Sequence, residues 1–380
     1  MKVLHVIDDL DHNGAQATLF RLLSAMDRKR FEPIVVSLLK GGTLRRPIEA
    51  LGVQVYALGM ANVRGAPRSM WRLVRIIRDL RPQIIQGWAY YGNLAATVGA
   101  ALALGSWPVI WNIRHEAHDL KYEKRRTSIA IRLGAFISRS PVRIIYCAWS
   151  SAKNHEALGY ASSGKIVIPS GIDLSQFITS REARTSVRSE MGIGEDTLVV
   201  GLVARFHPMK DHSNFLRAAA ILGARRRLDI HFLMAGSGVD TNNASLMRLV
   251  GDNGLSTRVH LLGERRDIPR LMAALDIGCC SSWTEASPNV IMEAMACGVP
   301  CVSTDVGDVA WVIGQAGRVV PPRDPEALAG AWEAVLTLDT DERRRLGAQA
   351  RQRIEELFSL PRMVDAYEQL YETVARSNSN

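Results

Sequence analysis

Short apolar runs alternate with longer stretches of helical periodicity along nearly the whole chain. Because strands that alternate with helices of about ten or more residues form parallel sheets with helices on both faces, this pattern predicts an α/β protein. The first series of predicted strands is residues 3–7, 33–37, 53–57, 84–86, 109–113, 143–147 and 166–168. The second series is residues 198–204, 229–235, 259–262, 277–280 and 301–303.

A polar stretch at residues 180–196, which contains Gly192 and Gly194, separates the two series. A chain of 380 residues also exceeds what one hydrophobic core usually serves. We therefore expect two Rossmann-like domains with a boundary near residues 170–195, facing a cleft where the carboxyl ends of their strands meet a ligand. After Pro325 the pattern is helical at residues 326–336, 341–357 and 361–375.

Positive charge is concentrated in the first half of the chain. Residues 1–170 hold 24 Lys or Arg and 11 Asp or Glu, a net of +13, so the remaining residues hold 23 and 27, a net of −4. Residues 64–81 and 121–143 both have the pattern of an amphipathic helix with a basic face, and Trp71 suits a lipid interface. An anionic membrane is one partner for these segments; the alternative is that they are solvated outer faces of Rossmann helices. Nucleic acid is not expected, because no aromatic platform accompanies the charge.

Cysteine usage and hydropathy indicate a cytoplasmic protein. The five cysteines include no C-x-x-C pair, which fits a reducing compartment and predicts neither a disulfide framework nor a zinc site. The first apolar run turns acidic at Asp8 and Asp9, too early for a signal peptide. Residues 83–113 carry no charge, but glycines and Pro108 divide them into strand, helix and strand, so we expect a buried core segment and not a membrane span.

The most informative segment runs from Glu285 to Glu293. Pro288 suits the first turn of a helix over residues 289–296, which Gly298 would end. Glu285 would then lie in the loop before the helix and Glu293 about one turn inside it. Free backbone N–H groups between them make an anion site, as a ligand with phosphates and hydroxyls requires. The alternative is a surface glutamate beside a helix that only packs.

Other candidate residues follow predicted strands. Arg205 and Lys210 lie between a strand end and a helix start, where two cations can neutralise a diphosphate. Gly236 and Gly238 form a G-x-G after the next strand, which serves a tight turn as readily as a phosphate. Gly14 follows the first strand and permits a close approach of a ligand phosphate or simply ends the loop.

Two histidines and one acidic pair complete the candidates. His115 ends a strand and could bind substrate or orient an acceptor hydroxyl, or it could be structural. His5 lies inside the first strand and is expected in the core. Asp339 and Asp341 form a D-x-D, but they stand at the start of a late helix, where Asp caps the helix. We see no nucleophilic triad, Walker loop or His-x-x-x-His pair.

Several motifs in order resemble those of the retaining family-4 glycosyltransferases of GT-B fold. The Glu285–Glu293 segment is the most specific of them. Asn13 stands where the family has the first Gly of its N-terminal loop, and Ser170 stands where it has Asn. The remaining motifs are residues 13–16, 168–173, 201–205 with Lys210, 235–238, 262–271 and 321–328.

The resemblance implies sugar transfer from a nucleotide-sugar, with retention at the anomeric carbon and no obligatory metal or other cofactor. It places the donor on a C-terminal domain, residues 176–360, and the acceptor on an N-terminal domain, residues 1–175, to which a last helix at about 361–380 returns. UDP is the expected nucleotide. The implied roles are diphosphate binding by Arg205 and Lys210, ribose binding by Glu293, sugar binding by Glu285, phosphate binding by the backbone of Ala286, Ser287, Asn289 and Val290, and further donor contacts from His115, Gly14, Gly236 and Gly238.

Within that family, residues 111–115, 151–160 and 205–212 look like those of bacterial enzymes that build exopolysaccharide, O-antigen or capsule. Such enzymes act on lipid-linked acceptors at the cytoplasmic face of the membrane, so we expect a cytoplasmic protein that is peripheral to that membrane. Two other functions stay open: a nucleotide-sugar 2-epimerase of the same double-Rossmann build, and a non-catalytic binding protein.

Overall fold

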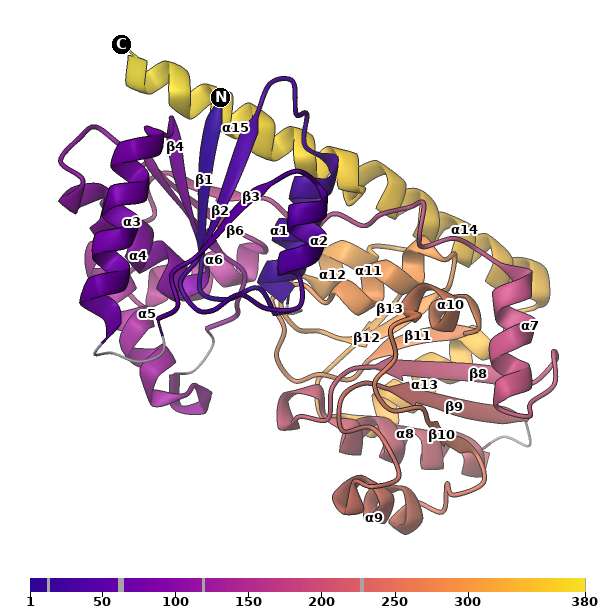
Figure 1. Ribbon diagram of the computed structural model, residues 1–380. Coiled ribbons are helices and arrows are strands. Elements are labelled where there is room, and N and C mark those ends of the chain that lie inside the picture. Colours follow the sequence, from indigo (N-terminus) through magenta and orange to yellow (C-terminus); the bar gives the residue numbers. More distant parts are fainter. Residues whose placement is uncertain (12–13, 61–64, 118–119, 226–228, 380) are drawn as a thin grey trace. The chain divides into compact units, whose positions relative to one another are not determined.

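The computed structural model describes residues 1–11, 14–60, 65–117, 120–225 and 229–379. The chain forms two compact units (Figure 1). Unit 1 comprises Met1–Gly171 and Leu360–Asn380, and unit 2 comprises Ile172–Ser359. The domain boundaries expected at residues 175/176 and 360/361 stay a prediction.

Unit 1 is built on a seven-stranded parallel sheet of order β3-β2-β1-β4-β5-β6-β7. Its central strands are buried on both faces, because helices cover each side of the sheet. The strands are β1 (Lys2–Ile7), β2 (Glu32–Ser37), β3 (Gln54–Ala57), β4 (Ile84–Trp88), β5 (Val109–Ile113), β6 (Arg143–Tyr146) and β7 (Lys165–Val167). The helices are α1 (Gly14–Ala25), α2 (Arg45–Ala50), α3 (Ala66–Leu80), α4 (Ala89–Leu102), the 3₁₀ turn η2 (Leu120–Tyr122), α5 (Arg125–Ile137), α6 (Trp149–Ala157) and α15 (Leu360–Ser379).

The last helix, α15, packs on unit 1, which confirms the expected return of the C-terminal helix (Figure 1). Tyr367 and Tyr371 are fully buried in the same core as β1 residues, and the Tyr367 hydroxyl accepts a hydrogen bond of 2.7 Å from the Asn112 side chain. Glu368 accepts a 2.8 Å bond from the backbone of Asp27 and pairs with Arg30. The helix is therefore an integral part of the unit.

Unit 2 is built on a six-stranded parallel sheet of order β10-β9-β8-β11-β12-β13. Its strands are β8 (Leu198–Val203), β9 (Ile230–Ala235), β10 (Val259–Leu261), β11 (Ile277–Cys280), β12 (Cys301–Thr304) and β13 (Gly317–Val320). Its helices are α7 (Arg181–Glu190), the 3₁₀ turn η3 (Pro208–Lys210), α8 (His212–Arg225), α9 (Ala244–Asp252), α10 (Ile268–Ala273), α11 (Asn289–Ala296), α12 (Val309–Ile313), α13 (Pro325–Leu336) and α14 (Thr340–Leu357).

Both parallel sheets confirm the predicted α/β class, with two local differences. The strand β13 was not predicted, because its four residues begin with Gly317 and Arg318 and give too short an apolar signal. The uncharged segment folds as β4, α4 and β5, as predicted, but Gly92, expected as one of the dividing glycines, lies inside α4, which begins at Ala89. Its first turn packs so tightly on β1 that a Cβ on Gly92 would lie 2.4 Å from the carbonyl oxygen of Val6, so this glycine permits helix–strand contact instead of breaking the helix.

Two smaller predictions, on His5 and Asp339, are confirmed. His5 is fully buried, and burial lowers its pKa to about 3. Asp339 caps α14 in a capping box with Glu342, as expected. All five cysteines are free and buried. In the described part of the chain, no helix combines the length and apolar character that a membrane crossing needs.

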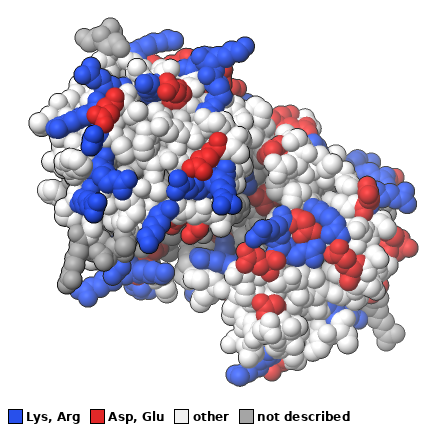
Figure 2. All heavy atoms as spheres, in the orientation of Figure 1, with Lys and Arg blue, Asp and Glu red and all other residues white. Residues whose placement is uncertain are grey.

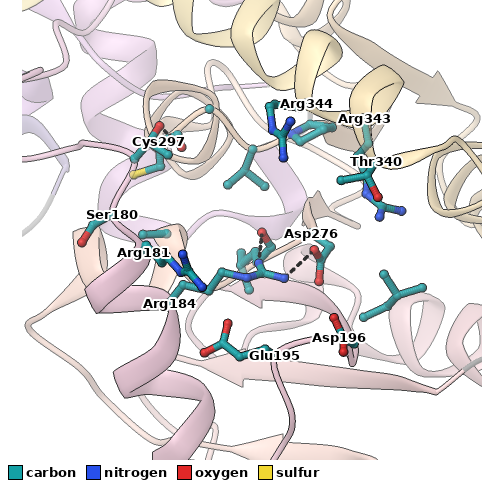
Figure 3. Close-up of a pocket in the computed structure, with 17 residues that line it drawn as sticks. Ser180, Arg181, Arg184, Glu195, Asp196, Asp276, Cys297, Thr340, Arg343 and Arg344 are labelled. Carbon is teal, nitrogen blue, oxygen red and sulfur yellow. Dashed lines mark hydrogen bonds and ion pairs between the residues drawn. The ribbon is translucent and has the colours of Figure 1, made fainter.

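A buried ion pair fastens α7 to the sheet of unit 2. Arg188 is 1 % exposed and donates a 2.7 Å bond to Asp276, which also accepts 2.9 Å and 2.8 Å bonds from Arg184 and the backbone of Val199. Figure 3 shows the Arg184 guanidinium reaching the Asp276 carboxylate. Because two cations and one backbone N–H converge on one carboxylate, removing it leaves a buried charge without compensation.

Replacing Asp276 by alanine is expected to lower the free energy of unfolding by about 3–5 kcal/mol, the typical cost of breaking a buried ion pair. Urea unfolding followed by circular dichroism measures the change. The matched control is Asp341→Ala, whose ion-pair partner Arg344 is 75 % exposed while Asp341 itself is 77 % exposed, and this change should have little effect. Equal effects of the two substitutions would contradict the structural role of Asp276.

Candidate functional site

Two loops at the carboxyl edge of the unit 2 sheet are joined to each other. The loop after β8 contains η3, and the loop after the adjacent strand β11 leads to α11. The backbone N–H and the indole N–H of Trp283 donate 3.0 Å bonds to the carbonyl oxygens of Met209 and Pro208. The Ser281 hydroxyl donates a 2.8 Å bond to the carbonyl oxygen of Lys210. The end of η3 is therefore held against the start of the second loop.

The side chains of Lys210 and Glu285 form an ion pair across these loops. The pair is mostly shielded, with 26 % and 15 % of the two side chains exposed. The Ser282 hydroxyl donates a 2.8 Å bond to the same oxygen, Oε1 of Glu285. Burial alone would favour the neutral amine, but the charge of Glu285, with a further contribution from Cys280, outweighs it and raises the pKa of Lys210. The predicted site therefore carries a fixed ammonium at neutral pH.

The backbone around Glu285 is held by a glycine that the sequence analysis missed. Gly307 has φ +57°, and a Cβ there would lie 2.1 Å from the carbonyl oxygen of Glu285 and 2.3 Å from that of Ala286. The next residue, Asp308, donates a 3.0 Å backbone bond to Ala286. Only glycine permits both this conformation and this approach. A glycine three residues after a strand was the one available signal, and it does not identify a partner.

The helix after Glu285 begins and ends where the sequence predicted. α11 spans Asn289–Ala296, so Glu285 lies in the preceding loop and Glu293 lies about one turn inside the helix. Pro288 is the residue before the helix and not a first-turn residue as predicted. No side chain caps the N-terminus of α11. Among the described residues, Oδ1 of Asn289 is buried without a hydrogen-bond partner. The first N–H groups of α11 thus have no side-chain cap, and phosphate binding by the backbone of residues 286–290 stays a prediction.

Arg205 and the G-x-G segment lie beside this arrangement, at the ends of β8 and β9. The Arg205 side chain is exposed and has no hydrogen-bond or ion-pair partner in the described ranges of the chain. A Cβ on Gly236 would lie 2.3 Å from the carbonyl oxygen of Ala204, and the backbone of Phe206 donates a 2.8 Å bond to Ser237. Close packing of the two strand ends thus explains Gly236. Donor contacts of Gly236 and Gly238 stay a prediction.

The two predicted site residues of unit 1 are described within that unit. His115 follows β5, and a 2.6 Å hydrogen bond joins its Nε2 to Oε1 of Glu123. This bond lowers the pKa of Glu123. The Ser151 hydroxyl donates a 2.7 Å bond to the His115 carbonyl, and the Tyr90 ring meets the imidazole edge-on at 5.9 Å. Glu123 was not predicted, because it lies eight residues from His115 and no sequence pattern links the two side chains.

Gly14 is the first residue of α1, and among the described residues outside its own helix turn and chain neighbours none has an atom within 4 Å of where its Cβ would be. Its predicted neighbour Asn13 lies outside the described residues. The start of α1 is linked to the residues that follow β1, because the Gln16 amide donates hydrogen bonds of 2.9 Å and 3.3 Å to the carboxylates of Asp9 and Asp8. Burial, with the nearby charge of Asp9, raises the pKa of Asp8 to about 6.

A pocket of about 580 Å³ opens at the opposite, amino edge of the unit 2 sheet (Figure 3). None of the predicted donor residues lines it. Three of the four arginines in its lining already have partners, since Arg184 pairs with Asp276, Arg343 bonds to a backbone carbonyl and Arg344 pairs with Asp341. Across the described residues, no cluster of three or more His, Cys, Asp or Glu is placed to hold a metal ion.

Comparison with known proteins identifies relatives along the chain. It is 33 % identical over 318 residues to the putative glycosyltransferase EpsF of Bacillus subtilis, covering 80 % of this chain and 79 % of that protein. It is 30 % identical over 199 residues to N-acetyl-alpha-D-glucosaminyl L-malate synthase of Bacillus anthracis, covering 52 % and 51 %. The chain spans about half the length of the first curated relatives it matches.

Solved structures share the fold over nearly the full length. Anabaena HepE in complex with UDP and glucose superposes with a TM-score of 0.83 at 20 % identity, covering 98 % of this chain and 100 % of that one. WaaG, a glycosyltransferase involved in lipopolysaccharide biosynthesis, superposes with a TM-score of 0.71 at 18 % identity, covering 98 % and 99 %. The two parallel sheets thus have the GT-B architecture.

The sequence also matches two family descriptions, one in each half of the chain. Residues 12–176 match "Glycosyltransferase Family 4", and residues 197–338 match "Glycosyl transferases group 1". Together with the EpsF relative, these matches show that the chain belongs to the family-4, or group 1, glycosyltransferases.

Proposed function

We propose that the protein is a hexosyltransferase that moves a sugar from a UDP-sugar to an acceptor, with retention at the anomeric carbon. The observation that carries the proposal is the Lys210–Glu285 pair beside the uncapped start of α11. The structures of HepE hold UDP and UDP-glucose, which supports a uridine nucleotide as the donor.

The charges of the site suit a leaving diphosphate. During transfer, the bond from the anomeric carbon to the diphosphate oxygen breaks, the acceptor oxygen takes its place, and the acceptor hydroxyl loses its proton. Negative charge grows on the diphosphate, and Arg205, Lys210 and the backbone of residues 286–290 stabilise it. An ammonium has three donors, so Lys210 keeps two for phosphate oxygens while it holds Glu285.

In this proposal, Glu285 and Glu293 accept hydrogen bonds from the hydroxyl groups of the donor sugar and of the ribose. Oε1 of Glu285 is occupied by Lys210 and Ser282, which leaves Oε2 to accept bonds from sugar hydroxyls. Glu293, one turn inside α11, binds the ribose hydroxyls. His115 orients the donor sugar or the acceptor hydroxyl, with its Nε2 held by Glu123.

We further propose a lipid-linked glycan acceptor, in the synthesis of a bacterial surface polysaccharide at the cytoplasmic face of the membrane. The involvement of WaaG in lipopolysaccharide biosynthesis and the net charge of +13 over residues 1–170 support this choice. An anionic membrane attracts such a basic segment.

Alanine substitution of Arg205 or Lys210 is expected to slow transfer by about two or more orders of magnitude, because each removes a cation from the leaving group. The assay measures sugar release from UDP-sugars to water and to added acceptors. Arg217→Ala, an exposed arginine on α8, is the matched control and should leave the rate unchanged.

The same assay run without acceptor separates the proposed transfer from 2-epimerisation, because only an epimerase interconverts donor sugars alone. Unchanged rates in both the Arg205 and Lys210 variants would show that the leaving group lies elsewhere.

The two glutamates are expected to respond differently to the same change. Glu293→Gln should raise the KM for the donor by about tenfold with kcat nearly unchanged, because ribose is bound equally in the ground and transition states. Glu285→Gln should instead lower kcat, because it alters contacts at the reacting sugar and the ion pair with Lys210. Steady-state kinetics over a range of donor concentrations measures both; the reverse pattern would exchange the assigned roles.

No metal ion is proposed as obligatory, because two protein cations supply the positive charge at the diphosphate. Prolonged treatment with a chelator, followed by assay in chelator, should leave at least about half of the activity. A loss that added Mg²⁺ or Mn²⁺ restores would contradict this part of the proposal.

A further inference from the structure

Helix α5 exposes apolar side chains along its outer face. Ala130, Ile131 and Gly134 are buried in unit 1, as expected for the inner face of a surface helix. Ile129, Leu133 and Phe136, however, are 50 %, 53 % and 86 % exposed. Their spacing of four and three residues aligns them in one stripe, which we call the α5 ridge. A row of large exposed apolar side chains on a soluble unit marks an interaction surface.

Arginines flank the α5 ridge. At 100° per residue, Arg125 and Arg132 lie on one side of the stripe and Arg126 lies on the other side, while Arg139 follows two residues after the end of the helix. None of these four has a hydrogen-bond or ion-pair partner among the residues that the structure describes.

The surrounding sequence is also uniformly basic. Residues 124–155 hold seven Lys or Arg and no Asp or Glu. Figure 2 shows Lys and Arg side chains along the lower edge of unit 1, where Figure 1 labels α5.

We propose that the α5 ridge docks the protein on an anionic lipid bilayer. The apolar stripe would enter the boundary between headgroups and acyl chains, while the arginines contact lipid phosphates. The inference rests on the proposed function, because a lipid-linked acceptor has to be met at a membrane surface.

The second basic helix, α3, is less suited to this role, although the sequence alone does not separate the two. Arg72 donates a 2.9 Å bond to the carbonyl oxygen of Leu58, and Arg78 donates bonds of 3.1 Å and 3.0 Å to the carbonyls of Ala103 and Leu102. These guanidinium groups serve the fold of unit 1.

A third of the four α3 arginines is paired as well, whereas Arg68 is exposed and has no partner among the residues that the structure describes. Arg75 lies 3.6 Å from Asp79 and over the ring of Trp71. Among the described residues, α3 therefore leaves one unpaired arginine for lipid phosphates, whereas α5 leaves three and Arg139 follows just beyond its end.

Charge also favours a bilayer over a second copy of the chain. In a two-fold symmetric contact through the α5 ridge, each set of four arginines would face the same set of the partner, and like charges oppose such pairing. A bilayer rich in phosphatidylglycerol offers the opposite charge and an apolar interior.

The test compares matched double variants on two helices. Arg132→Glu/Phe136→Ser changes the α5 ridge, and Arg75→Glu/Trp71→Ser makes the same two kinds of change at exposed residues of α3. Binding is measured by sedimentation with vesicles of equal parts phosphatidylglycerol and phosphatidylcholine. The α5 variant should bind at least about tenfold more weakly than wild type and the α3 variant within about twofold. Thermal unfolding confirms that both variants fold.

Three outcomes would overturn the proposal: equal loss of vesicle binding in both variants, no loss in the α5 variant, or a wild-type dimer that the α5 variant abolishes while vesicle binding persists. Hydrolysis of soluble UDP-sugar is measured in parallel and should be unchanged in both variants. Absence of hydrolysis in every form would refute the transferase proposal, whereas the vesicle result would still decide the role of the α5 ridge.

Discussion

The ion pair between Lys210 and Glu285 joins two loops that lie 75 residues apart in the chain. It fixes an ammonium and a carboxylate at the carboxyl edge of one parallel sheet, next to the uncapped start of α11. Trp283 helps to hold the two loops together with one hydrogen bond from its indole N–H and one from its backbone N–H. Gly307 packs closely against the backbone of Glu285 and Ala286 and supports the second loop. If the proposed function is correct, the charges that contact the diphosphate are already in place before the donor binds, and little reorganisation is required.

Much of the fold and part of this site could be predicted, because their signals are local. Alternating apolar runs and helical periodicity are properties of contiguous residues, and so are the limits that Pro288 and Gly298 set on α11. The positions of Glu285 and Glu293 relative to that helix followed directly. The short strand β13 carried too little local signal to be predicted.

Other features depend on contacts between distant segments, which periodicity does not encode. The need for glycine at position 307 arises only because the backbone of Glu285 and Ala286 packs against it. Glu123 becomes relevant to His115 only because the tertiary structure brings the two side chains within hydrogen-bond distance. In the same way, α3 and α5 have similar patterns, but Arg78 bonds to carbonyl groups at the end of α4, whereas the arginines of α5 remain exposed. The tertiary structure therefore distinguishes α3 from α5, although the two helices have similar sequence patterns.

A crystal structure of the protein with bound UDP tests the central claim most directly. The account predicts diphosphate oxygens within about 3 Å of the Arg205 guanidinium and of Nζ of Lys210, with the ribose hydroxyls on Glu293. A nucleotide bound instead in the pocket that Arg184 and Arg343 line, at the opposite edge of the sheet, would contradict it.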